Sequence, residues 1–101
     1  TFLLFANTKI NKDTFDAAKR ARTLAERSLD FADAKLVFDG PVFEIEDTRE
    51  DYGETRILCF GLLHGRLVTL GYVQRDDTRH IFTMRKANAR EKKKFGSDLA
   101  K

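Results

Sequence analysis

Two-residue turns between strand-like segments constrain this chain more than any other feature of its sequence. Four segments between Val42 and Lys86 carry β-branched, aromatic or alternating residues, as strands do, and they cover residues 42–46, 56–63, 66–75 and 78–86. His64-Gly65 and Asp76-Asp77 separate the last three. Strands joined by so short a turn pair antiparallel, because a parallel pair needs a long crossover. The sequence therefore predicts a four-stranded antiparallel meander.

Helical patterns precede these strands. Thr14 or Asp16 can cap a helix over about 17–27, in which small apolar residues recur at helical spacing. Asp30 can cap a second helix, and Asp39-Gly40-Pro41 ends it, since Gly and Pro together stop a helix. Two short helices with a tight connector predict an N-terminal αα-hairpin.

A further helix is expected after the last strand. Asn88 and Glu91 have the spacing of a capping box, and Gly96 is a natural helix end. Helices and strands that are segregated along the chain indicate the α+β class. The expected fold is thus an αα-hairpin, a four-stranded antiparallel sheet and a C-terminal helix.

Residues 1–13 are expected to form an N-terminal extension, either loosely attached or added to the sheet as an edge strand, and 14–101 one small domain. The apolar run Phe2–Ala6 is far too short to span a bilayer, and no basic segment precedes it as in a signal peptide. We expect no membrane association. The single cysteine, Cys59, cannot form an internal disulfide, so a cytoplasmic protein is the simplest interpretation.

Metal and nucleophile chemistry have little support in the sequence. His64 and His80 lie on different elements, and no paired His or Cys spacing of a zinc site occurs. Gly-rich phosphate loops are absent too, so we expect neither a metal nor a cofactor. Cys59 lies mid-strand among apolar neighbours and is expected to be buried and inert.

Charge is distributed unevenly, although the net charge is only +3. Residues 44–54 hold six carboxylates against the single base Arg49, whereas residues 85–94 hold six bases against one acid. A basic end and an acidic loop indicate a polyanionic ligand, a mixed-charge protein partner, or both.

Arginines at the ends of the predicted strands could bind such a polyanionic ligand. Regular alternation places Arg79 and Arg85 on one side of the last strand, with Arg56 on a neighbouring strand. Arginine grips phosphate bidentately and stabilises the charge that develops when phosphate is attacked. Glu54 or Tyr52 could transfer a proton. These groups would suffice for metal-free RNA cleavage by the 2′-hydroxyl, and we expect RNA contacts from the basic residues Lys86, Arg90 and Lys93.

The segments around these residues resemble the BrnT family of bacterial toxins. The most specific pieces are Asp-Tyr-Gly-Glu-x-Arg at 51–56 and Arg-Lys-Ala at 85–87, within a similarity that covers roughly residues 14–95. The chain departs from the family at Ala17, where Pro is usual, and at 26–28, where a family histidine is missing.

The resemblance implies a RelE-like ribonuclease that arrests translation by cleaving RNA. It also implies neutralisation by a BrnA-like ribbon-helix-helix antitoxin, so that the toxin would reach DNA only through its antitoxin. Two other interpretations stay open at this point. One is a module that clamps RNA or protein through the basic helix without cutting, and the other is a structural interaction subunit.

Overall fold

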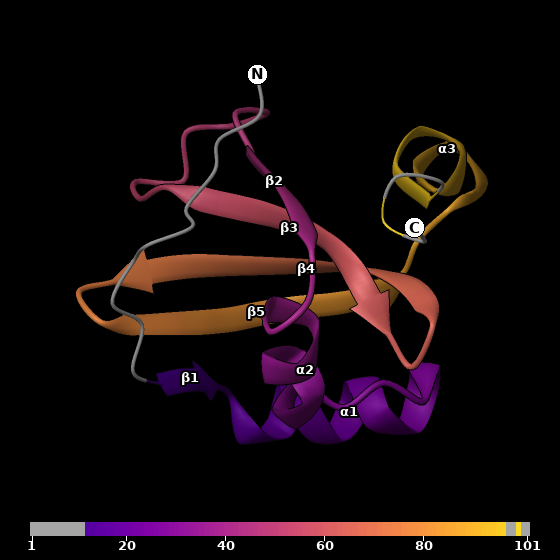
Figure 1. Ribbon diagram of the computed structural model, residues 1–101. Coiled ribbons are helices and arrows are strands. Elements are labelled where there is room, and N and C mark those ends of the chain that lie inside the picture. Colours follow the sequence, from indigo (N-terminus) through magenta and orange to yellow (C-terminus); the bar gives the residue numbers. More distant parts are fainter. Residues whose placement is uncertain (1–11, 97–98, 100–101) are drawn as a thin grey trace.

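The computed structural model describes residues 12–96 and 99, which form one mixed sheet with helices on both faces (Figure 1). The elements in chain order are β1 (Lys12–Phe15), α1 (Ala17–Arg27), the 3₁₀ turn η1 (Phe31–Asp33), α2 (Ala34–Phe38), β2 (Val42–Glu46), β3 (Arg56–Leu63), β4 (Arg66–Arg75), β5 (Thr78–Lys86), α3 (Ala89–Glu91) and the π-helical turn η2 (Lys92–Gly96).

The sheet has five strands in the order β1-β5-β4-β3-β2. Strands β2 to β5 form the expected antiparallel meander, with the expected bounds. β1 pairs with β5 in parallel, from Lys12 opposite Thr78 to Phe15 opposite Ile81. The prediction of four strands, all antiparallel, is therefore wrong, because a fifth strand comes from the residues before α1. The expected boundary between residues 13 and 14 falls inside this strand.

The N-terminal αα-hairpin is also wrong. α1 has the expected bounds, and the Asp16 side chain caps it by accepting a hydrogen bond from the Lys19 amide at 2.9 Å. The second helix is replaced by a 3₁₀ turn and a helix of only five residues. The Asp30 side chain accepts from the Ala32 amide, which favours a tight first turn, and Gly40-Pro41 stops the helix soon afterwards.

Two apolar clusters fix the helices to the sheet. α2 and η1 pack on one face, over residues such as Cys59, Leu70 and Met84. The other face carries Phe60, which stacks on Phe95 of η2 with ring centroids 4.4 Å apart. In Figure 1, α1 and α2 accordingly lie together on one side of the sheet, and α3 on the other.

The C-terminal helix begins as expected. Asn88 and Glu91 form the capping box, in which each side chain accepts a hydrogen bond from the other's backbone amide. The last described element, η2, ends at the predicted Gly96, and Leu99 is buried in the second cluster.

A bulge at Phe82 interrupts the alternation of β5. Tyr72 lies opposite Ile81, but Gly71 lies opposite Thr83, so Phe82 has no partner on β4. The extra residue exchanges the two faces of the strand beyond it. Arg79 and Arg85 are therefore on opposite faces of the sheet, and the prediction that they share one side is wrong.

Candidate active site

Arg56, the first residue of β3, is held between two aromatic rings. Its Cζ lies 4.1 Å from the centroid of the Tyr52 ring and 4.7 Å from that of Phe82. The Nε atom is buried and has no hydrogen-bond partner in the part of the chain that the structure describes. None of the ion pairs among the described residues involves Arg56. A guanidinium that is oriented by stacking in this way is suited to bind an anion.

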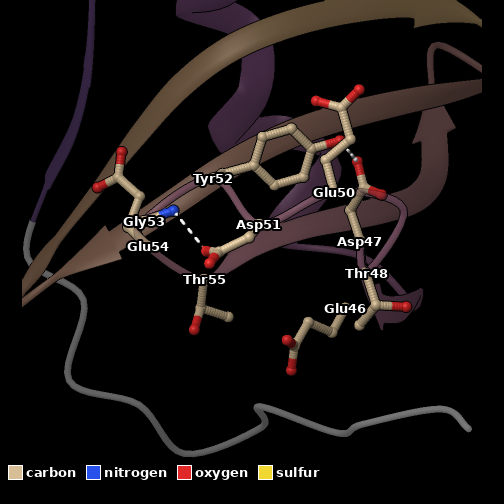
Figure 2. Close-up of a pocket in the computed structure, with 9 residues that line it drawn as sticks. All are labelled: Glu46, Asp47, Thr48, Glu50, Asp51, Tyr52, Gly53, Glu54 and Thr55. Atoms are coloured by element: carbon tan, nitrogen blue, oxygen red, sulfur yellow. Dashed lines mark hydrogen bonds between the residues drawn. The ribbon is translucent and has the colours of Figure 1, made fainter.

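The 47–55 loop is held in shape by Asp47, whose side chain is buried. Arg49 donates two hydrogen bonds of 2.8 Å to the Asp47 carboxylate. The Tyr52 hydroxyl donates to the same carboxylate at 3.3 Å, as Figure 2 shows. The hydrogen bonds from Arg49 lower the pKa of Asp47 to about 2. Asp47 therefore stays ionised at neutral pH and anchors the tyrosine whose ring lies against Arg56.

An acidic pocket of about 480 Å³ opens within this loop, as Figure 2 shows. Its lining includes Glu46, Asp47, Glu50, Asp51 and Glu54. Such a lining repels phosphate and other anions, so an anion that binds Arg56 has to approach from the other side. Glu54 itself turns to Arg75, with oxygens 3.2 and 3.3 Å from one guanidinium nitrogen.

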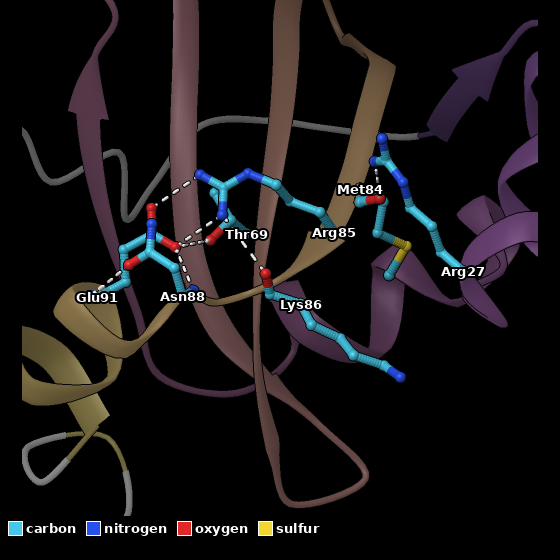
Figure 3. A network of polar contacts seen from close by, with 7 residues as sticks. All are labelled: Arg27, Thr69, Met84, Arg85, Lys86, Asn88 and Glu91. Atoms are coloured by element: carbon cyan, nitrogen blue, oxygen red, sulfur yellow. Dashed lines mark hydrogen bonds and ion pairs between the residues drawn. The ribbon is translucent and has the colours of Figure 1, made fainter.

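Arg85 lies on the same face of the sheet as Arg56. Its guanidinium donates two hydrogen bonds to Glu91, at 2.7 and 2.8 Å, and the Thr69 hydroxyl donates to the same carboxylate at 3.1 Å (Figure 3). The hydrogen bonds from Arg85 lower the pKa of Glu91, and the carboxylate in turn raises the pKa of Arg85. An arginine and a carboxylate that are both ionised thus border this face beside α3.

Arg79 has a different environment, on the side of α2. Its Nε donates to Asp13 at 3.0 Å, and its Cζ lies 3.5 Å from the centroid of the Phe38 ring. The structure therefore brings Arg56 and Arg85 to one face with Tyr52, and it leaves Arg79 on the other.

A buried acid beside Arg79 was missed by sequence reasoning. Glu44 lies in a strand that alternates apolar and acidic residues, a pattern typical of one buried and one solvated face, yet it is only 7% exposed. The Tyr72 hydroxyl donates to it at 2.5 Å. Burial raises the pKa of Glu44, and burial together with this carboxylate raises that of Tyr72. The alternation gave the correct faces of β2, but it could not show that helices would cover both of them.

The three predicted RNA-binding residues do not gather on one surface. Lys86 lies opposite Val68 and shares its face, where α1 and α2 pack. Arg90 and Lys93 are exposed on the C-terminal helix, on the other face.

The described residues give little support for a thiol nucleophile, a metal site or a membrane span. Cys59 is buried, and burial raises the pKa of its thiol. Within residues 12–96 and 99, no three His, Cys, Asp or Glu side chains are grouped so that they could hold a metal ion. None of the helices in this part of the chain has the length and apolar character needed to cross a membrane.

Sequence reasoning also missed the contributions of Phe82 and Glu91 to this face. Phe82 gave no signal, because a bulge without Gly or Pro looks like ordinary strand. Glu91 was visible only as half of a capping box. Its second contact, with Arg85, could have been proposed from its position one turn into a helix that follows directly on the strand.

Comparison with known proteins assigns a family to this chain. The family described as "Ribonuclease toxin, BrnT, of type II toxin-antitoxin system" matches residues 15–91. No curated protein matches the sequence. The matched residues include β3 to β5, the 47–55 loop and the capping box. Because the match covers most of the chain, this protein belongs to the BrnT family of ribonuclease toxins of type II toxin–antitoxin systems.

Proposed function

We propose that this toxin is a metal-independent endoribonuclease that binds the scissile phosphate through Arg56 on the Tyr52 and Arg85 face of the sheet. The observation that carries the proposal is the stacked Arg56 guanidinium, whose buried Nε has no partner within the described residues. A preorganised cation stabilises the charge that develops on an attacked phosphate, and it needs no metal to do so.

Arg85 is the second cation of the site. In the free protein Glu91 occupies it with two hydrogen bonds. A phosphate arriving at this face competes with that carboxylate, or it binds the outer edge of the same guanidinium. Arg79 has no place in this arrangement, because it points to the opposite face and pairs with Asp13.

The reaction itself is an internal transfer. The 2′-hydroxyl oxygen bonds to phosphorus, the bond from phosphorus to the 5′-oxygen breaks, and the products are a 2′,3′-cyclic phosphate and a 5′-hydroxyl. A base takes the proton of the 2′-hydroxyl, and an acid returns one to the 5′-oxygen. Tyr52 is the better placed of the two predicted groups, because its ring lies against Arg56 while Glu54 is bound to Arg75.

The experiment is a cleavage assay on 5′-labelled single-stranded RNA with a large excess of chelator. We expect cleavage by the wild-type chain and cyclic phosphate ends on its products. Arg56→Ala and Arg85→Ala should each lower the rate about 10²- to 10³-fold, as loss of a preorganised charge donor does. Arg66→Ala is the matched control, since Arg66 is exposed at the far end of the β3–β4 hairpin.

Two outcomes would contradict the mechanism. One is that chelator stops the wild-type reaction, and the other is that the Arg56 and Arg85 variants cut at the wild-type rate. A chain that binds RNA without cutting it would support the alternative, a non-catalytic binding module.

Cleavage of cellular RNA by such an enzyme would arrest translation, and its host needs an inhibitor. We propose that the antitoxin is a BrnA-like ribbon-helix-helix protein and that the toxin reaches DNA only through it. Family membership and the resemblance of 51–56 and 85–87 to BrnT proteins support this partner. Co-expression with the neighbouring reading frame tests it, and failure to co-purify at low and moderate salt would count against it.

A further inference from the structure

A small basic crevice lies along the outer edge of β5, where β1 stops. β1 covers this edge only as far as Ile81, and α1 runs beside the strand from there. The crevice has a volume of about 160 Å³, and seven residues line it: Lys19, Arg22, Thr23, Glu26, Arg27, Phe82 and Thr83. The first four are spaced at i, i+3, i+4 and i+7, so one stripe of α1 forms its wall.

The charge of the crevice is positive, with three bases against the single carboxylate of Glu26. Arg27 donates to the Met84 carbonyl oxygen at 3.0 Å, and Figure 3 shows it reaching β5 from α1 while Arg85 extends the other way. The side chains of Lys19 and Arg22 form no ion pair with any carboxylate in the described part of the chain. Both are exposed and available to an anion.

Phe82 connects this crevice to the Arg56 site. The same bulged residue lines the crevice and stacks on the Arg56 guanidinium, 4.7 Å from its ring centroid. The Phe82 ring thus lies between the Arg56 guanidinium and the bases of the crevice. Cations that follow a backbone, interrupted by aromatic rings on which bases stack, are how proteins bind single-stranded nucleic acid.

We propose that the crevice is a second phosphate subsite, which holds the RNA strand one or more nucleotides beyond the phosphate at Arg56. The inference rests on the proposed function, because it takes RNA at Arg56 as its starting point. In this arrangement a base lies over Phe82, and the adjoining backbone enters the crevice between Lys19 and Arg22. The acidic pocket of the 47–55 loop directs the strand this way, since it repels phosphate on its own side.

The test compares wild-type protein with the double variant Lys19→Gln/Arg22→Gln. Binding to 2′-O-methyl RNA, which lacks the attacking hydroxyl, is measured by fluorescence anisotropy over a range of salt, with oligomers of three and twelve nucleotides. The matched control is Lys35→Gln/Arg66→Gln, which removes the same charge from α2 and from the first residue of β4. Melting temperatures verify that each variant is folded, and Arg22→Gln alone replaces the double variant if the latter is not.

We expect the double variant to bind the twelve-nucleotide RNA more weakly. The slope of log K against log salt should fall by roughly 0.7 for each lost phosphate contact, while the short oligomer and the control variant keep wild-type behaviour. Equal affinity of the double variant and the control for the long RNA would overturn the proposal. So would a defect seen only with the antitoxin, because the crevice would then serve the protein partner.

Cleavage of unmodified RNA, measured in parallel, separates this inference from the proposed function. If the wild-type chain binds RNA without cutting it, the proposed catalysis fails, and the crevice is still decided by the anisotropy comparison. If the wild-type chain binds no RNA at all, the crevice proposal is overturned.

Discussion

At the scale of single residues, Tyr52 and Arg56 depend on each other. The hydroxyl of Tyr52 donates to Asp47, and its ring lies against the Arg56 guanidinium. In the proposed mechanism this side chain therefore both transfers a proton and orients Arg56. These roles separate in two substitutions, because phenylalanine keeps the ring and leucine loses it.

Tyr52→Phe should lower cleavage about 10²- to 10⁴-fold, as loss of a proton-transfer group does, with little change in RNA affinity. Tyr52→Leu should weaken RNA binding as well, since Arg56 loses one of its two stacking partners. Single-turnover rates and binding constants distinguish these effects. Wild-type cleavage by Tyr52→Phe, together with loss of cleavage in Glu54→Gln, would assign the proton transfer to Glu54 instead.

Arg79 is expected to stabilise the fold and to have no part in cleavage. Arg79→Ala leaves Asp13 and Glu44 without their neighbouring cation and removes the contact with Phe38. Leaving part-buried polar groups unpaired costs about 1–3 kcal/mol, which urea denaturation would measure. Cleavage by the folded fraction should match that of the wild type. If Arg79→Ala loses as much cleavage as Arg56→Ala while its stability is unchanged, Arg79 is a catalytic residue after all.

Asp47 gives the loop an acid-sensitive anchor. Its pKa falls from 3.8 to about 2 on folding, so the folded state binds fewer protons than the unfolded state between these values. The contribution to stability is therefore complete above about pH 3.8 and is lost as the pH falls toward 2. Asp47→Asn should flatten that part of the curve of unfolding free energy against pH. Asp39→Asn, at an exposed position, should leave the curve unchanged.

At the scale of elements, the Phe82 bulge decides which residues share a face. Gly71 makes room for it, because a Cβ at this position would lie 2.7 Å from Phe82 Cζ and 2.6 Å from Thr83 Cγ2. Both atoms belong to side chains that are themselves fixed by the sheet and by Arg56.

Gly71→Ala should destabilise the protein by about 1–3 kcal/mol through overpacking and move the Phe82 ring off Arg56. The expected result is a lower melting temperature together with weaker RNA binding. Gly96→Ala is the control, since a Cβ there meets nothing within 4 Å. A wild-type melting temperature for Gly71→Ala would show that the bulge adjusts freely.

The bulge also explains why the sequence predicts the strands of this site but not the faces on which its arginines lie. The bounds of β2 to β5 and the capping box follow from local patterns, and all were predicted. The face of each arginine depends on whether β5 alternates without interruption, and that depends on Gly71 of the neighbouring strand. Likewise, the burial of Glu44 depends on Tyr72, which lies 28 residues further along the chain. Such long-range conditions leave no local signal.

At the scale of the whole molecule, the bounds of β1 and its parallel pairing with β5 were not predicted. Its four residues, Lys-Asp-Thr-Phe, have no alternation of their own, and pairing with Thr78–Ile81 is what makes them a strand. A hydrogen bond of 2.9 Å between the Thr14 hydroxyl and His80 Nδ1 adds a side-chain contact to that pairing.

Two truncations test the contribution of β1. A chain that lacks residues 1–13 also loses Lys12 and Asp13, and with them the ion pair to Arg79. It should melt at a lower temperature than a chain that lacks only residues 1–11. The difference between the two reports on Lys12 and Asp13 alone. Identical melting temperatures would show that this half of β1 adds nothing to the fold.

The parallel pairing of β1 with β5 also has a consequence for the order of assembly. The two strands are separated by α1, α2 and the three other strands of the sheet. A nascent chain emerges from its N-terminus, so β1 has no partner until the residues from Thr78 onward have left the ribosome. Contacts between such distant segments slow folding, because the chain between them must be ordered first. The Arg56 face is completed by that same strand, through Phe82 and Arg85. Under the proposed mechanism, the toxin therefore gains its RNA-cleaving site only after β5 has been synthesised and paired.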